Sequence, residues 1–211
     1  MRLENEEMIE TWKSIWTEYG WIPKVLTEDD AMNHPDFEHF EQLLNILPSE
    51  ELRMPFYRFI SISTISTGGW YSDYDTFPLY MGAKDVSYPN SGRFTIYDGF
   101  MPSFMSADFE EWNRITNTLF TSLEKIEGEK KDIVAALQNL WKNDEQGPSV
   151  TNNQIYRVSE VYNGKEDLKC NMYRRRRAIH FKMSISLQQA VQVAPNFFRE
   201  WHRKCVLEGP H

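Results

Sequence analysis

The segment of residues 67–78 constrains the fold more than any other part of the chain, because a Gly-Gly step leads directly into two closely spaced acids. Asp73 and Asp75 lie two residues apart, and side chains at that spacing share one face of an extended strand. Gly68-Gly69 lets the backbone turn sharply before the strand, and residues 76–78, which end in proline, are predicted to end it. The segment therefore predicts a short strand that delivers two carboxylates to one point.

Two carboxylates this close repel each other unless a proton or a cation lies between them. Oxygen ligands suit Mg²⁺ or Mn²⁺, so Asp73 and Asp75 are candidate metal ligands. The alternative is an ordinary acidic turn, since Asp-x-Asp by itself is a common pattern. His180, in a late apolar segment, is a candidate third ligand. Its alternative role is that of a core histidine, which is the commoner fate of a lone histidine on an apolar strand.

The composition describes a globular chain and excludes several classes of protein. Of the 211 residues, 41% are hydrophobic and 14% aromatic, which suffices for one domain over residues 1–211 with a real core. A formal net charge of -8 gives no reason to expect binding to nucleic acid or to an anionic membrane surface. The N-terminus is acidic, unlike a signal peptide, and no apolar run approaches the roughly 20 residues of a membrane helix. We therefore expect a soluble, cytoplasmic chain without a membrane segment.

Cys170 and Cys205 are the only cysteines in the sequence. Two cysteines cannot form a disulfide framework, and the absence of a Cys-x-x-Cys pair excludes the usual zinc and redox motifs. We expect two reduced, inert thiols in a reducing compartment.

Hydrophobic periodicity predicts helices that alternate with strands. The helices are expected over residues 5–19, 37–47, 55–66, 109–126 and 133–141, with a last helix that begins at Pro195. Extended segments are expected over residues 21–26, 93–97, 103–107, 155–162 and 178–182. Local signals support some of the boundaries: a stop at Gly20, a capping box at residues 27–30, and Pro55 at a first helical position. The alternation predicts an α/β fold with a mostly parallel sheet flanked by helices, in which ligands lie at the carboxyl ends of strands.

Three further places in the sequence are candidates for ligand contact. Arg58 would orient an acid or bind a phosphate through its guanidinium fork, or else form a surface or structural ion pair. Asp108 would cap the helix that follows it, or else face a sugar or an acceptor hydroxyl. The arginine run at residues 174–177 would be a solvated face, or would bind diphosphate or an acidic acceptor.

Together these residues resemble a known family. Pro55-Phe-Tyr-Arg-Phe59, followed by Gly-Gly-Trp-Tyr-Ser-Asp-Tyr-Asp at residues 68–75, resembles the DXD sugar-binding region of GT-A-fold glycosyltransferases. Looser similarity extends to residues 10–31, to an acceptor-side segment at 102–112 and to a late histidine-containing strand at 177–181. The resemblance covers most of the chain.

The resemblance implies a single-domain, Rossmann-like GT-A enzyme of the hexosyltransferase type. Such an enzyme transfers a sugar from a nucleotide-diphosphate sugar, such as a UDP- or GDP-sugar, to an acceptor hydroxyl in glycan or polysaccharide synthesis. The related families mostly retain the anomeric configuration. By position, the resemblance implies Mn²⁺ or Mg²⁺ held by Asp73, Asp75 and His180, and a catalytic role for Asp108. The donor contacts that it implies are Arg58, Gly69, Tyr71, Asp73, Tyr74, Asp75 and Ser106.

Relatives begin with a β-strand before the first helix, whereas this sequence begins at the helix, so either another segment replaces that strand or the sequence is a fragment. The main alternative is therefore a non-catalytic module that binds a nucleotide sugar or a glycan. A third alternative is a metal-dependent nucleotide-sugar pyrophosphorylase or phosphohydrolase. That class requires a Gly-rich N-terminal phosphate loop, which the sequence does not contain.

Overall fold

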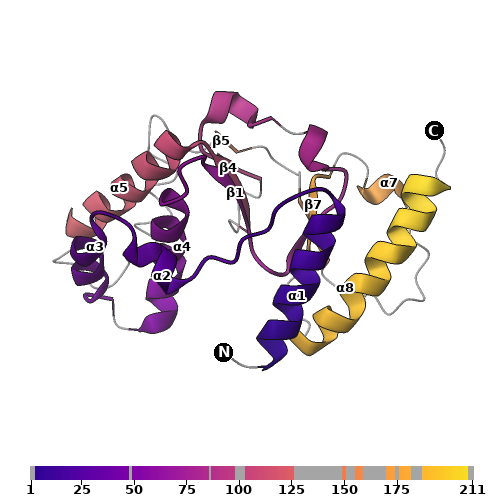
Figure 1. The fold of residues 1–211 in the computed structure, drawn as a ribbon, viewed down its shortest axis with the longest axis horizontal. Coiled ribbons are helices and arrows are strands. Elements are labelled where there is room, and N and C mark those ends of the chain that lie inside the picture. Colours follow the sequence, from indigo (N-terminus) through magenta and orange to yellow (C-terminus); the bar gives the residue numbers. More distant parts are fainter. Residues whose placement is uncertain are drawn as a thin grey trace.

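Helices form the two ends of the molecule, and short strands lie between them (Figure 1). The computed structural model describes residues 3–47, 49–85, 87–97, 103–125, 149–150, 155–158, 170–173, 176–181 and 187–208. Its helices are α1 (Leu3–Glu18), α2 (Glu28–Met32), α3 (Phe37–Leu44), α4 (Glu50–Ser63), α5 (Phe109–Lys125), α7 (Cys170–Tyr173) and α8 (Leu187–Trp201). Short 3₁₀ and π segments are η1 (Ala83–Asp85), η2 (Pro89–Gly92) and η3 (His202–Leu207). The strands are β1 (Gly69–Ser72), β2 (Thr76–Pro78), β3 (Thr95–Ile96), β4 (Phe104–Ala107), β5 (Ser149–Val150), β6 (Ile155–Val158) and β7 (Ala178–Phe181).

The described strands form two small, mainly antiparallel sheets, so the predicted mostly parallel, Rossmann-like GT-A sheet is wrong. One sheet has the order β1-β4-β3-β5 and the other the order β2-β7-β6. The β1–β4, β3–β4 and β2–β7 pairs are antiparallel, whereas the β3–β5 and β6–β7 pairs are parallel. A parallel pair needs a crossover of about a dozen residues or more, whereas β3 reaches β4 through a short connection that suits antiparallel pairing.

The acidic segment divides the two sheets. Residues 76–78, which the sequence predicts as the end of a strand, instead form β2 and pair with β7. β1 and β2 are separated only by residues 73–75, yet they belong to different sheets. The two acids are therefore located where one sheet gives way to the other.

The first helix ends as predicted, but the strand expected after it is absent. α1 closes at Gly20, whose φ of 82° is the left-handed conformation that glycine tolerates, and Trp21 N donates to Trp16 O at 3.1 Å. Residues 21–26 form no strand, and the side chain of Ile22 is 96% exposed. Pro23 cannot donate a ladder hydrogen bond, which disfavours sheet pairing at this point.

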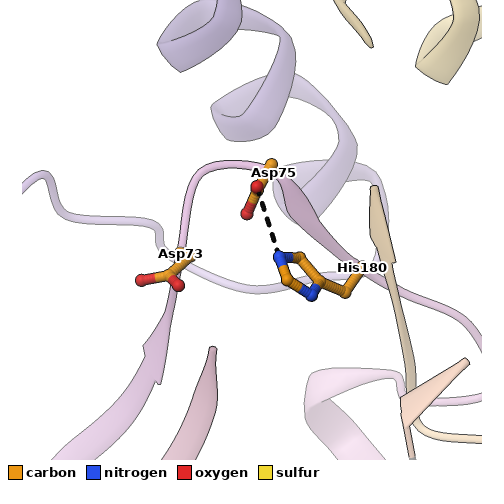
Figure 2. Close-up of side chains that lie close together, drawn as sticks. All are labelled: Asp73, Asp75 and His180. Atoms are coloured by element: carbon orange, nitrogen blue, oxygen red, sulfur yellow. Dashed lines mark ion pairs between the residues drawn. The ribbon is translucent and has the colours of Figure 1, made fainter. Parts of the chain in front are cut away.

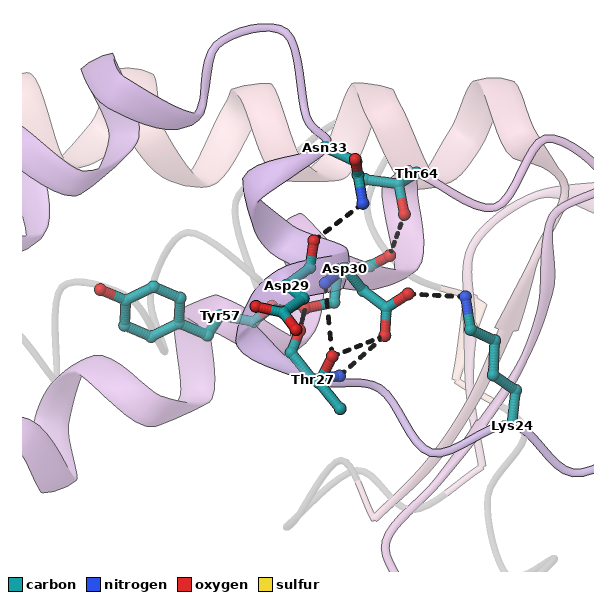
Figure 3. A network of polar contacts seen from close by, with 8 residues as sticks. Lys24, Thr27, Asp29, Asp30, Asn33, Tyr57 and Thr64 are labelled. Carbon is teal, nitrogen blue, oxygen red and sulfur yellow. Dashed lines mark hydrogen bonds and ion pairs between the residues drawn. The ribbon is translucent and has the colours of Figure 1, made fainter.

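The capping box predicted at residues 27–30 is confirmed at the start of α2. Thr27 Oγ1 accepts from Asp30 N at 3.4 Å, and the Asp30 carboxylate accepts from Thr27 N at 2.9 Å (Figure 3). Lys24 adds an ion pair to Asp30 at 2.6 Å, which helps to hold the pKa of that carboxyl below its usual range. The start of α2 is thus determined by local sequence.

Two prolines predicted as helix starts lie inside helices. Pro55 is within α4, which begins after Ser49, and Pro195 is within α8, which begins at Leu187. A proline inside a helix removes one backbone hydrogen bond. The buried apolar faces of both helices outweigh that loss, with Phe56 and Ile60 buried on α4 and Phe197 on α8.

The two cysteines form a disulfide, so the prediction of reduced thiols is wrong. Cys170 on α7 is bonded to Cys205 in η3, 35 residues further along the chain. The packing of α7 against the end of α8 brings them together, and sequence spacing alone does not reveal that contact.

Among the described residues, three clusters of buried apolar side chains support these elements. The first joins α1, β2, β7 and α8, the second joins α2, α3, α4 and α5, and the third joins α4 and α5 to β3 and β4. The helix predicted at residues 133–141 lies outside the described residues. No helix in the described part of the chain is long and apolar enough to cross a membrane.

Candidate metal centre

The acidic loop, residues 73–75, connects β1 to β2 as a tight turn. Asp73 N donates to Ser103 O at 2.9 Å, and Thr76 N donates to Asp73 O at 2.9 Å, which closes the turn. The two carboxylates therefore converge because the chain turns between them, and not because they share the face of one strand. The sequence predicts their meeting correctly but through a different local structure.

Gly68 is required where the chain enters β1. Its φ is 67°, and a Cβ built there would lie 2.7 Å from Ala107 O and 2.7 Å from backbone atoms of Asp108. Both the left-handed backbone and the contact with β4 exclude a side chain. A Cβ on Gly69 would meet nothing within 4 Å, so only the first glycine of the pair is demanded by the fold.

His180 joins the two acids from the neighbouring strand (Figure 2). Its Nε2 lies 3.3 Å from Asp75 Oδ2, and one ligand atom from each of Asp73, Asp75 and His180 lies within 4.8 Å of the others. The pairing of β2 with β7 places His180 opposite Thr76, next to the acidic loop. The three residues predicted as metal ligands are thus brought together from two segments about 105 residues apart in the chain.

The surroundings of these three side chains suit a cation. The side chains of Asp73, Asp75 and His180 are 30%, 14% and 5% exposed. Asp75 Oδ1 and His180 Nδ1 are buried and have no hydrogen-bond partner among the described residues. A buried carboxylate oxygen without a donor is costly. Two carboxylates and one imidazole form a donor set that fits Mn²⁺ or a similar divalent ion.

Arg58 and Tyr71 hold the Asp73 carboxylate. Tyr71 Oη donates to Asp73 Oδ1 at 2.7 Å, Arg58 Nη1 lies 3.5 Å from the same oxygen, and the guanidinium lies over the Tyr71 ring at 5.3 Å. Burial nevertheless raises the pKa of Asp73 above its usual range, because desolvation outweighs the nearby Arg58 charge. The pKa of Tyr71 is also raised, mainly by burial, so its hydroxyl stays a donor.

Helix α1 supports the acidic loop through two tryptophans that the sequence does not single out as site residues. Trp12 Nε1 donates to Ser72 Oγ at 3.1 Å, and Trp16 Nε1 donates to Thr76 O at 3.1 Å. Ser72 Oγ is itself 2.8 Å from Asp73 O and 3.0 Å from Thr76 O. These contacts join residues 60 positions apart, which no local pattern reveals.

The structure places the remaining predicted donor contacts, Gly69, Tyr74 and Ser106, in three different surroundings. Gly69 lies in β1, where its carbonyl accepts from Trp112 Nε1 at 3.1 Å. Tyr74, at the tip of the acidic loop, is 44% exposed. Ser106 is fully buried in β4 and its hydroxyl lies 2.8 Å from Tyr97 Oη. Only Tyr74 of this group projects into solvent beside the acids.

Asp108 caps helix α5, which is the first of the two roles considered for it. Its Oδ1 accepts from Glu111 N at 2.9 Å, and the Asp108 carbonyl accepts from Trp112 N at 3.0 Å. Of the arginine run at residues 174–177, the structure describes the last two. Arg177 lies over the Tyr97 ring at 5.7 Å, and its carbonyl accepts from Leu79 N at 2.8 Å.

Comparison with known proteins identifies a family for this chain but does not identify an activity. The family described as Domain of unknown function (DUF8765) matches residues 2–189. Neither a search of curated proteins nor a search of solved structures finds a match to this chain.

Proposed function

We propose that this chain, which belongs to the DUF8765 family, is a metal-dependent glycosyltransferase. Its substrates would be a nucleotide-diphosphate sugar, such as a UDP- or GDP-sugar, and an acceptor hydroxyl on a glycan. The observation that carries the proposal is the convergence of Asp73, Asp75 and His180, whose ligand atoms lie within 4.8 Å of one another. The proposal rests on this site and on the resemblance of residues 55–78, and not on the architecture of the sheets.

The chemistry of sugar transfer explains why such a site would be needed. The leaving nucleoside diphosphate gains negative charge, and the net charge of the chain is already -8, so the donor needs local positive charge. A divalent ion held by Asp73, Asp75 and His180 supplies that charge and acts as a Lewis acid.

The chain's own residues keep the site ready for a cation. Arg58 and Tyr71 fix Asp73 in one orientation, so that its second oxygen remains free to bind. Trp16 and Ser72 fix the backbone at Thr76, directly after Asp75. A site held this firmly loses little entropy when it binds a ligand.

A binding module without catalysis is the second candidate, and the position of Asp108 favours it. One oxygen of that carboxylate is used to cap α5, so Asp108 is less free to act on an acceptor hydroxyl. Hydrolysis or transfer of the donor in the presence of Mn²⁺ would separate the two candidates, since only the enzyme consumes the nucleotide sugar.

The test is calorimetric titration of the chain with Mn²⁺ and then with a panel of UDP- and GDP-sugars. We expect Asp75→Asn to abolish Mn²⁺ binding and Mn²⁺-dependent donor binding, because the substitution removes one ligand charge. Asp36→Asn, an exposed acid at the start of α3, serves as the matched control and should bind like the wild type. Unchanged Mn²⁺ and donor affinity in Asp75→Asn would refute the proposal.

A further inference from the structure

The side chains of Thr76 and His180 face each other across the β2–β7 pair. Phe181 N donates to Asp75 O at 2.9 Å and Leu79 N donates to Arg177 O at 2.8 Å, while Thr76 lies opposite His180 in the register. The hydrogen-bonded positions of an antiparallel pair alternate with non-hydrogen-bonded ones, so Thr76 and His180 occupy a non-hydrogen-bonded position. The Cα atoms there are about 4.5 Å apart and the side chains are at their closest.

Both side chains are buried and each carries a polar atom. Thr76 is fully buried and His180 is 4% exposed. Thr76 Oγ1 and His180 Nδ1 have no hydrogen-bond partner among the described residues. Leaving two buried groups unpaired costs free energy, and facing side chains on adjacent strands are able to satisfy each other.

Nδ1 of the imidazole has a different hydrogen-bonding role in each state of His180. Nε2 lies 3.3 Å from Asp75 Oδ2, so a proton on Nε2 leaves Nδ1 as an acceptor. If Nε2 is a metal ligand, Nδ1 carries the proton and must donate it to an outer partner. A hydroxyl serves in both states because it donates or accepts as it turns.

We propose that the Thr76 hydroxyl is the outer hydrogen-bond partner of His180 Nδ1 and thereby positions the imidazole toward Asp73 and Asp75. This inference rests on the proposed function, because it assigns His180 to the metal centre. Thr76 is a positioning residue that acts through His180. The backbone of Thr76 is already fixed by Trp16, so only its side-chain torsion needs to adjust.

The experiment compares Thr76→Val, which has nearly the same shape without the hydroxyl, with Thr76→Ser, which keeps the hydroxyl. We expect Thr76→Val to weaken Mn²⁺ binding by about tenfold or more in calorimetric titration, and Thr76→Ser to restore most of it. Thr116→Val, which removes a buried hydroxyl on α5, is the matched control and should leave Mn²⁺ affinity unchanged. Equal Mn²⁺ affinity in wild type and Thr76→Val, or equal weakening in the Val and Ser variants, overturns the inference.

A second measurement keeps this inference separate from the proposed function. In the metal-free protein, long-range ¹H–¹⁵N NMR reports the hydrogen bonding of each nitrogen of His180. We expect the Nδ1 signal to move in Thr76→Val and to stay near its wild-type position in Thr76→Ser. An unmoved Nδ1 signal in Thr76→Val overturns the inference even if Mn²⁺ binds. A moved signal in a chain that binds no Mn²⁺ supports the hydrogen bond and refutes the metal-dependent function instead.

Discussion

The contacts of Asp73 stabilise the charged form of its carboxyl group, whereas its burial destabilises that form. Tyr71 donates to its carboxylate and Arg58 lies 3.5 Å away, yet desolvation prevails and the pKa of Asp73 is raised. In the metal-free protein this carboxylate is therefore a source of instability at neutral pH. A charged residue that destabilises the ligand-free fold is typical of a functional site.

This imbalance predicts how the stability of the metal-free chain depends on pH. Since the folded pKa of Asp73 exceeds the unfolded one, its favourable contribution is complete below the unfolded pKa, about 3.9, and is lost as pH rises through the folded pKa. Asp73→Asn, which stays neutral, should therefore melt a few degrees higher than wild type at pH 7 with a chelator present. The advantage should shrink as the pH falls toward 4.

Thermal melts of both proteins between pH 4 and pH 8 measure this difference. Adding Mn²⁺ should raise the melting temperature of the wild type and leave Asp73→Asn unchanged, because only the wild type keeps the full ligand set. A variant that melts below wild type at pH 7 without metal would show that the Arg58 and Tyr71 contacts outweigh the burial of the charge.

The sequence predicts the candidate ligands of the site but not the residues that support them. The two acids are predicted from their spacing and His180 from the resemblance of its strand to a known family, and the structure brings all three together. Trp16 and Thr76 are not, because their roles depend on contacts with distant residues, β2 with α1 in one case and β2 with β7 in the other. The spacing of the two acids is visible within a short stretch of sequence, whereas the residues that support them are not.

At the scale of elements, the sequence predicts helices better than sheets. α1, α3 and α5 follow apolar stripes that repeat within each helix, and their positions are confirmed to within a few residues at most ends. Strand partners depend on contacts across the chain, so the parallel sheet predicted from alternation is wrong. The apolar run at residues 21–26 resembles a strand in sequence, but in the structure these residues do not pair with any described strand.

Helix α1 holds β2 through one indole, and the strength of this contact is testable. Trp16 Nε1 donates to Thr76 O, whereas Trp201 Nε1 on α8 is buried with no partner among the described residues. Replacing either tryptophan by phenylalanine removes a similar volume of buried ring. Trp16→Phe should therefore destabilise the chain more than Trp201→Phe, by about 1 kcal/mol, the net value of one hydrogen bond.

Urea unfolding of the two variants measures that difference in the free energy of unfolding. Ser72 Oγ also donates to Thr76 O at 3.0 Å. Because this hydrogen bond remains when Trp16 is replaced, the loss of stability should not include the cost of an unpaired buried carbonyl. Equal destabilisation in both variants would mean that the Trp16 indole contributes by packing alone.

At the scale of the whole molecule, the candidate metal centre lies where one sheet gives way to the other. The cluster of α1, β2, β7 and α8 includes Ile179 and Phe181, which flank His180, and Tyr71, which donates to Asp73, packs against the cluster of α4, α5, β3 and β4. Asp73 is held by Arg58 on α4 and Tyr71 on β1, whereas His180 lies in β7, so the three candidate ligands depend on elements from both clusters. Metal affinity should therefore report on the folding of the complete domain.

The Cys170–Cys205 disulfide is the one covalent restraint on this arrangement, and its removal gives the last prediction. It closes a loop of 35 residues that contains β7 and α8, and the chain-entropy estimate for a loop of that length is about 4 kcal/mol. Cys205→Ser should accordingly lower the melting temperature by roughly 10 °C. A reducing agent should lower that of the wild type to the same value and leave the variant unchanged, whereas a reductant that affects neither protein would show that the two cysteines are not joined in solution. Because Mn²⁺ would bind the folded state through His180 on β7, it should recover part of the lost stability in Cys205→Ser, and a metal that stabilises the variant no more than a chelator does would show that the variant does not bind Mn²⁺.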